Sequence, residues 1–205
     1  MKKSRTAAAL RTAALAGLLL GVATVVQAQV SLSAYGGYLG SSGIENETTG
    51  QDAKVSSGGG FLLAIGTDLD GARELQLQFA QQSTTLAPGG GAAPFDLTLR
   101  YLHLGGTAFV DRPIGPGPYA VGGLGVTQFS PSTTGFGSEW KPSLNVGFGY
   151  AWPLASNLML RAEARGFFTL VNSSGGFLCA GGCVAVLKSD VFTQYGALIG
   201  LTARF

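Results

Sequence analysis

The chain has 205 residues, of which 33 are glycine and only 12% are charged. A water-facing surface needs more charge than this, whereas a surface that faces lipid needs little, so the composition argues against an ordinary soluble domain. The small basic excess, 13 Lys and Arg against 11 Asp and Glu, gives no indication of nucleic-acid binding once its position in the chain is considered.

Residues 1–28 have the three parts of a secretory signal peptide. A basic leader is followed by a largely apolar stretch over residues 13–26 and by the small-residue cleavage site Val26-Gln27-Ala28. The apolar stretch falls short of the roughly 20 residues that a spanning helix needs, so we favour a cleaved leader over a retained membrane anchor. The leader contains four of the basic residues: Lys2, Lys3, Arg5 and Arg11. Its removal leaves nine basic and 11 acidic residues, a net charge of −2.

After residue 28 the apolar residues alternate with polar or small ones, which is the period of a half-buried β-strand. The sixth segment is the clearest, with Leu144, Val146 and Phe148 on one face and Asn145 and Gly147 on the other. Eight segments are predicted as strands, over residues 30–38, 61–66, 75–80, 96–110, 119–129, 143–152, 158–170 and 195–205. Strands satisfy their backbone in lipid only as a closed barrel.

The fourth segment changes its apolar phase, from Leu97 and Leu99 to Leu102 and Leu104. We therefore expect a β-bulge near Arg100 or Tyr101.

The predicted connections alternate in length, as they do in outer-membrane barrels with short periplasmic turns and long outer loops. The short ones cover residues 68–72, 111–118 and 153–157, and the long ones cover 40–57, 83–94, 130–141 and 171–189. We therefore predict an all-β fold, an eight-stranded antiparallel up-and-down transmembrane β-barrel over residues 29–205 with both ends in the periplasm.

Aromatic rings favour the two membrane interfaces. We expect one girdle on the periplasmic side and one on the outer side. The first contains Phe109, Tyr119, Trp152 and Phe205, and the second contains Tyr38, Phe61, Phe79, Phe129 and Phe168.

The interior of an eight-stranded barrel is just wide enough for its own side chains, so we expect a filled lumen and no diffusion pore. The inward face of segment 158–170 carries Arg161, Glu163 and Arg165, which we expect to form a network with Gln76 and Gln78, joined by Gln194. Buried charges must be paired to be tolerated, so a structural network is favoured over a catalytic cluster. The Gly-x-Gly pairs at residues 123–125 and 147–149 are interpreted as small residues that leave space for bulky side chains in the lumen.

His103 is the only histidine, and it has no neighbouring nucleophile in the sequence. Lipid A deacylases are eight-stranded barrels with a His-x-Ser pair, and here Gly105 stands where that serine would be. We therefore expect a structural histidine and no catalytic, cofactor or metal site.

Cys179 and Cys183 form a Cys-Ala-Gly-Gly-Cys unit in the last long loop. Export to an oxidising compartment favours a disulfide between them. Metal binding is the alternative, and two thiols without a nearby histidine make a poor site.

Four stretches resemble the outer-membrane β-barrel domain family, which is similar to the OmpA and OmpX transmembrane barrels: Tyr101-Leu102-His103-Leu104, the glycine-rich residues 117–125, Gly147-Phe148-Gly149-Tyr150 and residues 160–165. The resemblance implies a Gram-negative cell-envelope protein surrounded by outer-membrane lipid and lipopolysaccharide. It also implies insertion by the outer-membrane assembly machinery, which reads the last strand. The signal would lie on its outward face, at Tyr195, Ile199, Leu201 and Phe205.

Two classes of function follow. The first is a non-enzymatic structural or surface-interaction protein, of the adhesion or resistance type, that acts on a host or other surface ligand through four outer loops on a rigid scaffold. The second is a lipid A-modifying barrel enzyme. A soluble barrel that carries a ligand is a third reading, which is disfavoured because much apolar side chain would face water.

We predict cleavage after Ala28. Amino-terminal sequencing of the protein recovered from the cell envelope should begin at Gln29, and recovery of an intact Met1 would rule out the signal-peptide interpretation.

Overall fold

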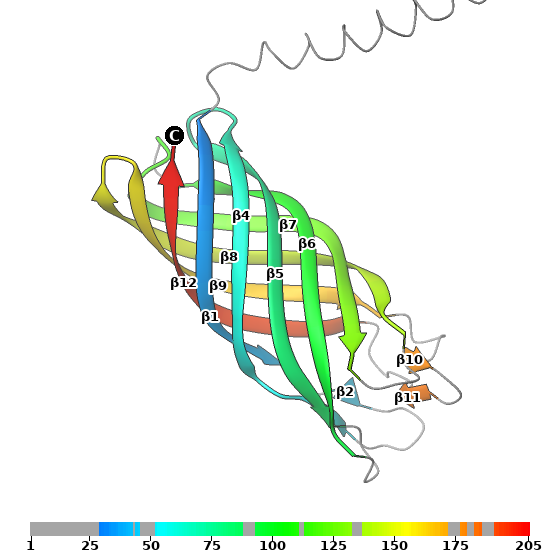
Figure 1. Ribbon diagram of the computed structural model, residues 1–205. Coiled ribbons are helices and arrows are strands. Elements are labelled where there is room, and N and C mark those ends of the chain that lie inside the picture. Colours follow the sequence, from blue (N-terminus) through cyan, green and yellow to red (C-terminus); the bar gives the residue numbers. More distant parts are fainter. Residues whose placement is uncertain are drawn as a thin grey trace, which may run out of the picture.

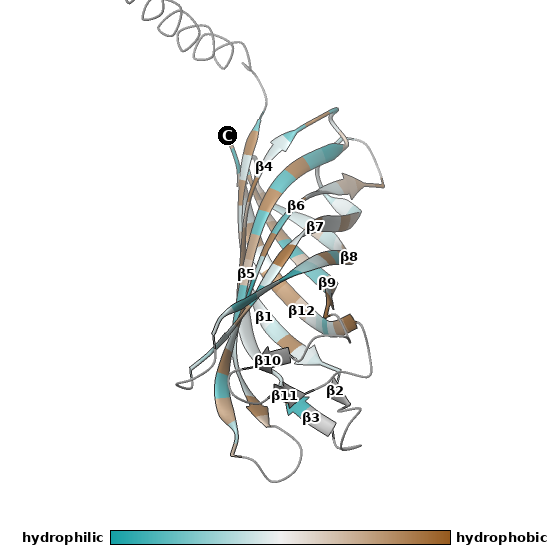
Figure 2. Cartoon of the chain, turned by 90° about the vertical axis from the view of Figure 1, so that its right-hand side faces the viewer, coloured by the Kyte–Doolittle hydropathy of each residue, from teal (hydrophilic) through white to brown (hydrophobic). Residues whose placement is uncertain are grey.

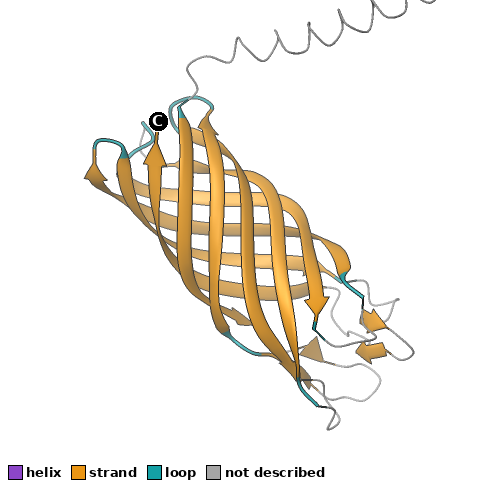
Figure 3. Ribbon diagram, viewed as in Figure 1, coloured by secondary structure: helices purple, strands orange, loops and turns teal. Residues whose placement is uncertain are grey.

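The computed structural model describes residues 29–42, 44–45, 52–87, 93–110, 113–132, 137–171, 177–179, 183–185 and 191–205. The predicted signal peptide lies outside these residues. The described chain consists of strands and the links between them (Figure 3). A search of this part of the chain found no helix with the length and apolar character that crossing a membrane requires.

Eight long antiparallel strands form a closed barrel (Figure 1). They are β1 (Val30–Ser41), β4 (Gly58–Asp68), β5 (Arg73–Ala87), β6 (Phe95–Phe109), β7 (Gly117–Pro131), β8 (Glu139–Ala155), β9 (Leu158–Leu170) and β12 (Val191–Arg204). Four short strands accompany them: β2 (Ile44–Glu45), β3 (Asp52–Val55), β10 (Phe177–Cys179) and β11 (Cys183–Ala185). The predicted fold class is confirmed.

The first and last long strands close the barrel. β1 pairs with β12 in one continuous register from Ser31↔Arg204 to Ser41↔Gln194. The remaining neighbours follow chain order, and the β5–β6 pairing completes the ring. The closed barrel expected from the sequence is therefore completed by the pairing of its first and last long strands.

The pleat sends successive side chains to opposite faces, which produces the banded hydropathy along the strands in Figure 2. On β1, Leu32 faces outward while Ser31 and Ser33 are buried in the lumen. The outward apolar residues cover every wall of the barrel and include Leu63, Ile65, Leu77, Leu104, Leu124, Phe148, Ile199 and Leu201. The chain therefore has an apolar exterior and buries its polar groups inside.

The two rims of the barrel differ. The turn end holds both barrel termini and the links 69–72, 110–116 and 156–157 (Figure 1). The loop end holds the links 42–57, 88–94, 132–138 and 171–190. The predicted division into two rims is correct, but residues 83–87 belong to β5 and not to a loop. Their β-branched and hydroxyl side chains extend the ladder with β6 as far as Leu86↔Phe95.

The predicted bulge near Arg100 is wrong. β6 keeps one register with β5 from Arg73↔Ala108 to Leu86↔Phe95, and one register with β7 beyond it. Leu97, Leu99 and Tyr101 are simply buried in the lumen. The apolar phase changes because the inside of the barrel becomes apolar towards the loop end.

The predicted aromatic girdles are partly wrong, because aromatic rings also pack inside the barrel at both of its ends. Trp152, Phe205, Tyr38 and Phe61 are exposed outward as expected. Phe109, Tyr119 and Phe129 are instead almost fully buried inside the barrel. These three rings fill the lumen and do not reach a membrane interface.

The turn between β4 and β5 is organised by two aspartates. Asp68 Oδ1 accepts a hydrogen bond from the Gly71 N–H at 2.7 Å, and Gly71 has the left-handed φ of 74° that suits glycine. Asp70 Oδ2 accepts a hydrogen bond from Arg73 Nε at 2.8 Å. This bond, helped by the backbone N–H of Ala72, lowers the pKa of Asp70 to about 2, so this carboxylate stays ionised in mildly acidic solution.

The outward position of Ile199 near the middle of β12 predicts a strong cost for a charge there. Ile199→Arg should destabilise the barrel by about 2–4 kcal/mol, because the guanidinium would lie in the hydrocarbon layer. Urea unfolding in lipid vesicles measures this cost. Leu69→Arg in the β4–β5 turn is the matched control, and equal costs for both variants would show that Ile199 does not face lipid.

Candidate functional site

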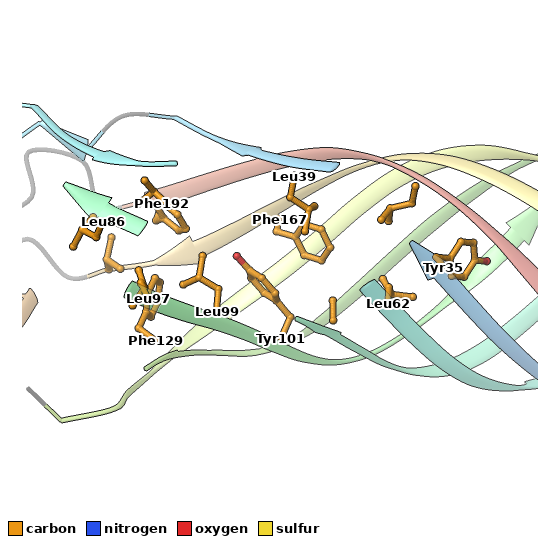
Figure 4. Packing of buried hydrophobic residues seen from close by; sticks show 14 of the residues in the cluster. Tyr35, Leu39, Leu62, Leu86, Leu97, Leu99, Tyr101, Phe129, Phe167 and Phe192 are labelled. Atoms are coloured by element: carbon orange, nitrogen blue, oxygen red, sulfur yellow. The ribbon is translucent and has the colours of Figure 1, made fainter. Parts of the chain in front are cut away.

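The lumen is built in three layers. At the loop end, fifteen buried apolar residues form a loop-end cluster, part of which is shown in Figure 4. The cluster includes Leu39, Leu86, Leu97, Leu99, Tyr101, Phe129, Phe167 and Phe192. A smaller turn-end cluster contains Phe109, Ile114, Tyr119, Ala151 and Met159. The charged residues predicted from the sequence lie between the turn-end cluster and most of the loop-end cluster. Tyr35 and Leu198 of the loop-end cluster reach the level of Arg161 and Glu163 on the neighbouring strands.

Arg161 lies at the boundary with the turn-end cluster and is fully buried. Its Nη2 contacts Glu74 Oε2 at 3.1 Å. Its guanidinium carbon stands 5.3 Å from the ring centroid of Phe109 and 5.2 Å from that of Tyr119. The ion pair and the two cation–π contacts hold a charge that would be very costly to bury alone.

Arg165 and Glu163 form the second ion pair, two residues apart on the inward face of β9. Arg165 Nη2 lies 2.5 Å from Glu163 Oε2, and Arg165 Nε donates to the same oxygen at 3.0 Å. The Tyr119 hydroxyl donates to the other oxygen of Glu163 at 2.9 Å. Gly149 makes room for this ring, since a Cβ there would lie 2.7 Å from the tyrosine oxygen.

A ladder of amides on β5 joins the two ion pairs. Gln76 Nε2 donates to Glu74 Oε2 at 3.2 Å, and Gln78 Nε2 donates to Gln76 Oε1 at 3.1 Å. Arg165 Nη1 donates to Gln78 Oε1 at 2.9 Å, so the ladder runs from one arginine to the other. Two arginines and two glutamates make this layer electrically neutral.

The structure brings together Arg161, Glu163, Arg165, Gln76 and Gln78, as the sequence analysis expects. Gln194 lies elsewhere: it accepts a hydrogen bond from the Tyr101 hydroxyl and donates to Gln82 Oε1 at 2.7 Å, nearer the loop end. Sequence reasoning missed Glu74, Tyr119 and Asn145. Glu74 could have been predicted from the sequence, because it lies two residues before Gln76 and therefore shares the inward face of Gln76 and Gln78.

His103 has a partner that sequence proximity could not reveal. Its Nε2 lies 2.8 Å from Ser143 Oγ on β8, and its ring stacks on those of Tyr101 and Phe167. Both polar side chains are buried in the lumen, with exposed fractions of 1% for His103 and 6% for Ser143. The pair therefore lies inside the barrel and not on its outer surface.

Cys179 and Cys183 face each other as backbone partners in the β10–β11 ladder. Directly opposed residues in antiparallel strands have Cα spacings that a disulfide can bridge. Their side chains lie outside the described part of the structure, so the disulfide stays a prediction. Within the described ranges, His, Cys, Asp and Glu side chains form no group of three that could hold a metal ion.

The outward face of β12 carries the predicted assembly residues. Tyr195, Ile199, Leu201 and Phe205 are all exposed. The strand end is fixed by Arg204, which donates to the Ile114 carbonyl at 3.1 Å and to Gln29 Oε1 at 2.7 Å. The four predicted residues therefore lie on the outer surface of the closed barrel.

No protein-family model and no curated protein matches the chain. Solved structures do match. The crystal structure of Neisserial surface protein A aligns with a TM-score of 0.59 at 14% identity, over 87% of this chain and 100% of that one. The N-terminal β-barrel domain of Pseudomonas aeruginosa OprF (87% and 98% covered) and Ail of Yersinia pestis (88% and 100% covered) each align with a TM-score of 0.49 at 17% identity. The chain thus has the fold of the small outer-membrane barrels.

Removing one partner of the Glu163–Arg165 pair should leave an uncompensated buried charge. Glu163→Gln should therefore cost about 3–5 kcal/mol of unfolding free energy, measured by urea titration in lipid vesicles. The double variant Glu163→Gln/Arg165→Gln should recover part of the loss.

Glu139→Gln is the control for that measurement. Glu139 pairs with Lys141 at the half-exposed loop rim at 3.2 Å, and such pairs contribute about 0–1 kcal/mol. Equal losses for Glu163→Gln and Glu139→Gln would contradict a structural role for the luminal pair.

Proposed function

We propose that this chain is a bacterial outer-membrane protein, exported by a cleaved signal peptide, that acts without catalysis as a structural or surface-interaction protein. The observation that carries the proposal is the combination of an apolar exterior with a lumen filled by its own side chains. The first feature suits insertion in a bilayer, and the second leaves the loop end as the surface that can meet other molecules.

The exterior supports the membrane location. Leu124 on β7 and Phe148 on β8 are each 70% exposed, and both face outward from these neighbouring strands. Such residues would be a severe liability in water, whereas in a bilayer they replace the packed core of a soluble protein. Outer-membrane lipid, including lipopolysaccharide, is therefore the proposed surrounding of the barrel.

The filled lumen argues against transport. Arg161, Tyr101 and Phe167 are among the largest fully buried side chains. Tyr101 and Phe167 lie in the loop-end cluster, and Arg161 lies beside the turn-end cluster. A solute would have to displace both the charged layer and the loop-end cluster to pass. A rigid scaffold that presents its loop end is the role that remains, and we infer a host or other surface ligand there.

The last strand supports assembly by the outer-membrane insertion machinery. Its outward apolar face ends at Phe205, and its edge pairs with β1 only once the barrel is complete. The assembly machinery is thus a proposed transient partner of β12.

A lipid A-modifying enzyme is the second candidate, because His103 Nε2 and Ser143 Oγ lie 2.8 Å apart, as a base and a nucleophile would. Both groups point into the lumen, away from the lipid that such an enzyme must reach. Release of fatty acid from lipopolysaccharide by the purified protein, abolished by Ser143→Ala, would establish the enzyme and refute the non-catalytic proposal.

Epitope insertion tests the proposed orientation. A tag in the link 88–94 should bind antibody on intact cells, because the loop end faces outward. A tag in the turn 156–157 should bind only after the outer membrane is permeabilised. The reverse pattern would overturn the orientation, and no signal from either tag in the outer-membrane fraction would overturn the location.

A further inference from the structure

A row of four outward residues crosses the barrel wall near the loop end. Gln81 on β5, Arg100 on β6, Gln128 on β7 and Trp140 on β8 are successive cross-strand partners. The sequence analysis assigned no role to Arg100. It is the only cation in this row, and it projects to the outside of the barrel.

The Arg100 guanidinium is positioned but not neutralised. Its Nε donates to Gln81 Oε1 at 3.0 Å, and its Nη1 donates to Gln128 Oε1 at 3.0 Å. Both acceptors are uncharged amides. Among the described residues no carboxylate forms an ion pair with Arg100, unlike Arg73, Arg161, Arg165 and Arg204. Its Nη2 thus remains available for an anion.

Arg100 lies at the level where the outward side chains of the barrel change from apolar ones to hydroxyl-bearing ones. One step towards the turn end on the same outward face lie Phe79, Leu102 and Val126. One step towards the loop end lie Ser83, Thr98 and Ser130. Trp140 is 57% exposed in the same row, as expected for a ring at a membrane interface. Arg100 therefore stands at the depth of the lipid headgroups.

An apolar groove begins directly below this cation. Its first wall follows the cross-strand row from Leu102 and Phe79 through Leu63 to Leu201. The small side chain of Ala34 lies in this row and leaves a hollow of about 460 Å³ on the outer surface.

The second wall runs from Leu77 through Ile65 and Leu32 to Leu158. Leu158 begins β9 beside the turn 156–157. The groove therefore leads from the neighbourhood of Arg100 down the lipid-facing wall towards the turn end.

We propose that Arg100 and this groove together bind one phosphorylated lipid, with a phosphate oxygen on the guanidinium and an acyl chain in the groove. The proposal rests on the proposed function, since it requires a bilayer around the barrel with headgroups at the loop end. A guanidinium donates several hydrogen bonds in one plane and suits phosphate. The groove beside it suits only an amphiphile, because a free phosphate would leave the apolar hollow of about 460 Å³ without an occupant.

Native mass spectrometry of the full-length mature protein, delipidated in detergent, tests the proposal. The probes are diphosphorylated lipid A, the same lipid without its phosphates, and inorganic phosphate. The wild-type protein should bind one molecule of diphosphorylated lipid A. Arg100→Gln should weaken this binding about tenfold, as expected for loss of one charge-assisted hydrogen-bonded contact, and should leave binding of the dephosphorylated lipid unchanged.

Ala34→Phe should fill the groove and weaken the binding of both forms of lipid A, with and without phosphates. The matched controls are Arg73→Gln, which removes a charge at the turn end, and Ala120→Phe, which adds a ring on the outward face of β7 away from the groove. Neither control should change lipid binding.

Equal affinity of the wild type and Arg100→Gln for diphosphorylated lipid A would overturn the proposal. Displacement of the lipid by inorganic phosphate at equal concentration would also overturn it, because the site would then be a simple anion site. Heat-modifiable migration on a gel is recorded for each sample. Absence of heat-modifiable migration in the wild type would refute the membrane barrel itself. If migration is normal but Arg100→Gln leaves the affinity for diphosphorylated lipid A unchanged, only the lipid site is refuted.

Discussion

The pairing of β1 with β12 is the interaction on which the rest of the structure depends. In hydrocarbon an unpaired N–H or C=O costs several kcal/mol, so a sheet in lipid cannot leave an edge open. The eleven cross-strand pairs from Ser31↔Arg204 to Ser41↔Gln194 join the open edge of β1 to the open edge of β12, so neither edge remains. Closure also decides which face of every strand becomes the exterior and which becomes the interior. The apolar exterior and the polar core both follow from it.

Once the barrel is closed, its lumen must be filled by side chains that tolerate burial. Arg161 and Arg165 do so because Glu74 and Glu163 lie within ion-pair distance, and the amides of Gln76 and Gln78 link the two ion pairs. The apolar clusters above and below keep water from screening this layer. Paired charges of this kind add directional constraints that an all-apolar filling lacks. With the interior filled, the barrel presents two surfaces to its surroundings, the loop end and the outer wall.

Much of this architecture is predictable from alternation alone, because a period of two determines both the strands and their inward faces. The charged face of β9 follows directly from the spacing of Arg161, Glu163 and Arg165. The errors have one physical origin, the assumption that apolar side chains in a membrane barrel face lipid. The inside of the barrel near the loop end is instead apolar and contains Leu97, Leu99 and Phe129. The two inward leucines led to the prediction of a bulge in β6, which is regular, and the inward ring of Phe129 was assigned to an aromatic girdle. The contact between His103 and Ser143 depends on which strands become neighbours across the lumen, and no local pattern carries that information. The disulfide between Cys179 and Cys183 stays a prediction.

Amide hydrogen exchange of the protein in lipid vesicles tests the closure most directly. Closure predicts that the backbone amides of β1 and β12 are as strongly protected as those of the central β5–β6 ladder, because each is hydrogen-bonded to a neighbour within the bilayer. Exchange along β1 and β12 that is orders of magnitude faster than in β5 and β6 would contradict it, since two open edges would then remain.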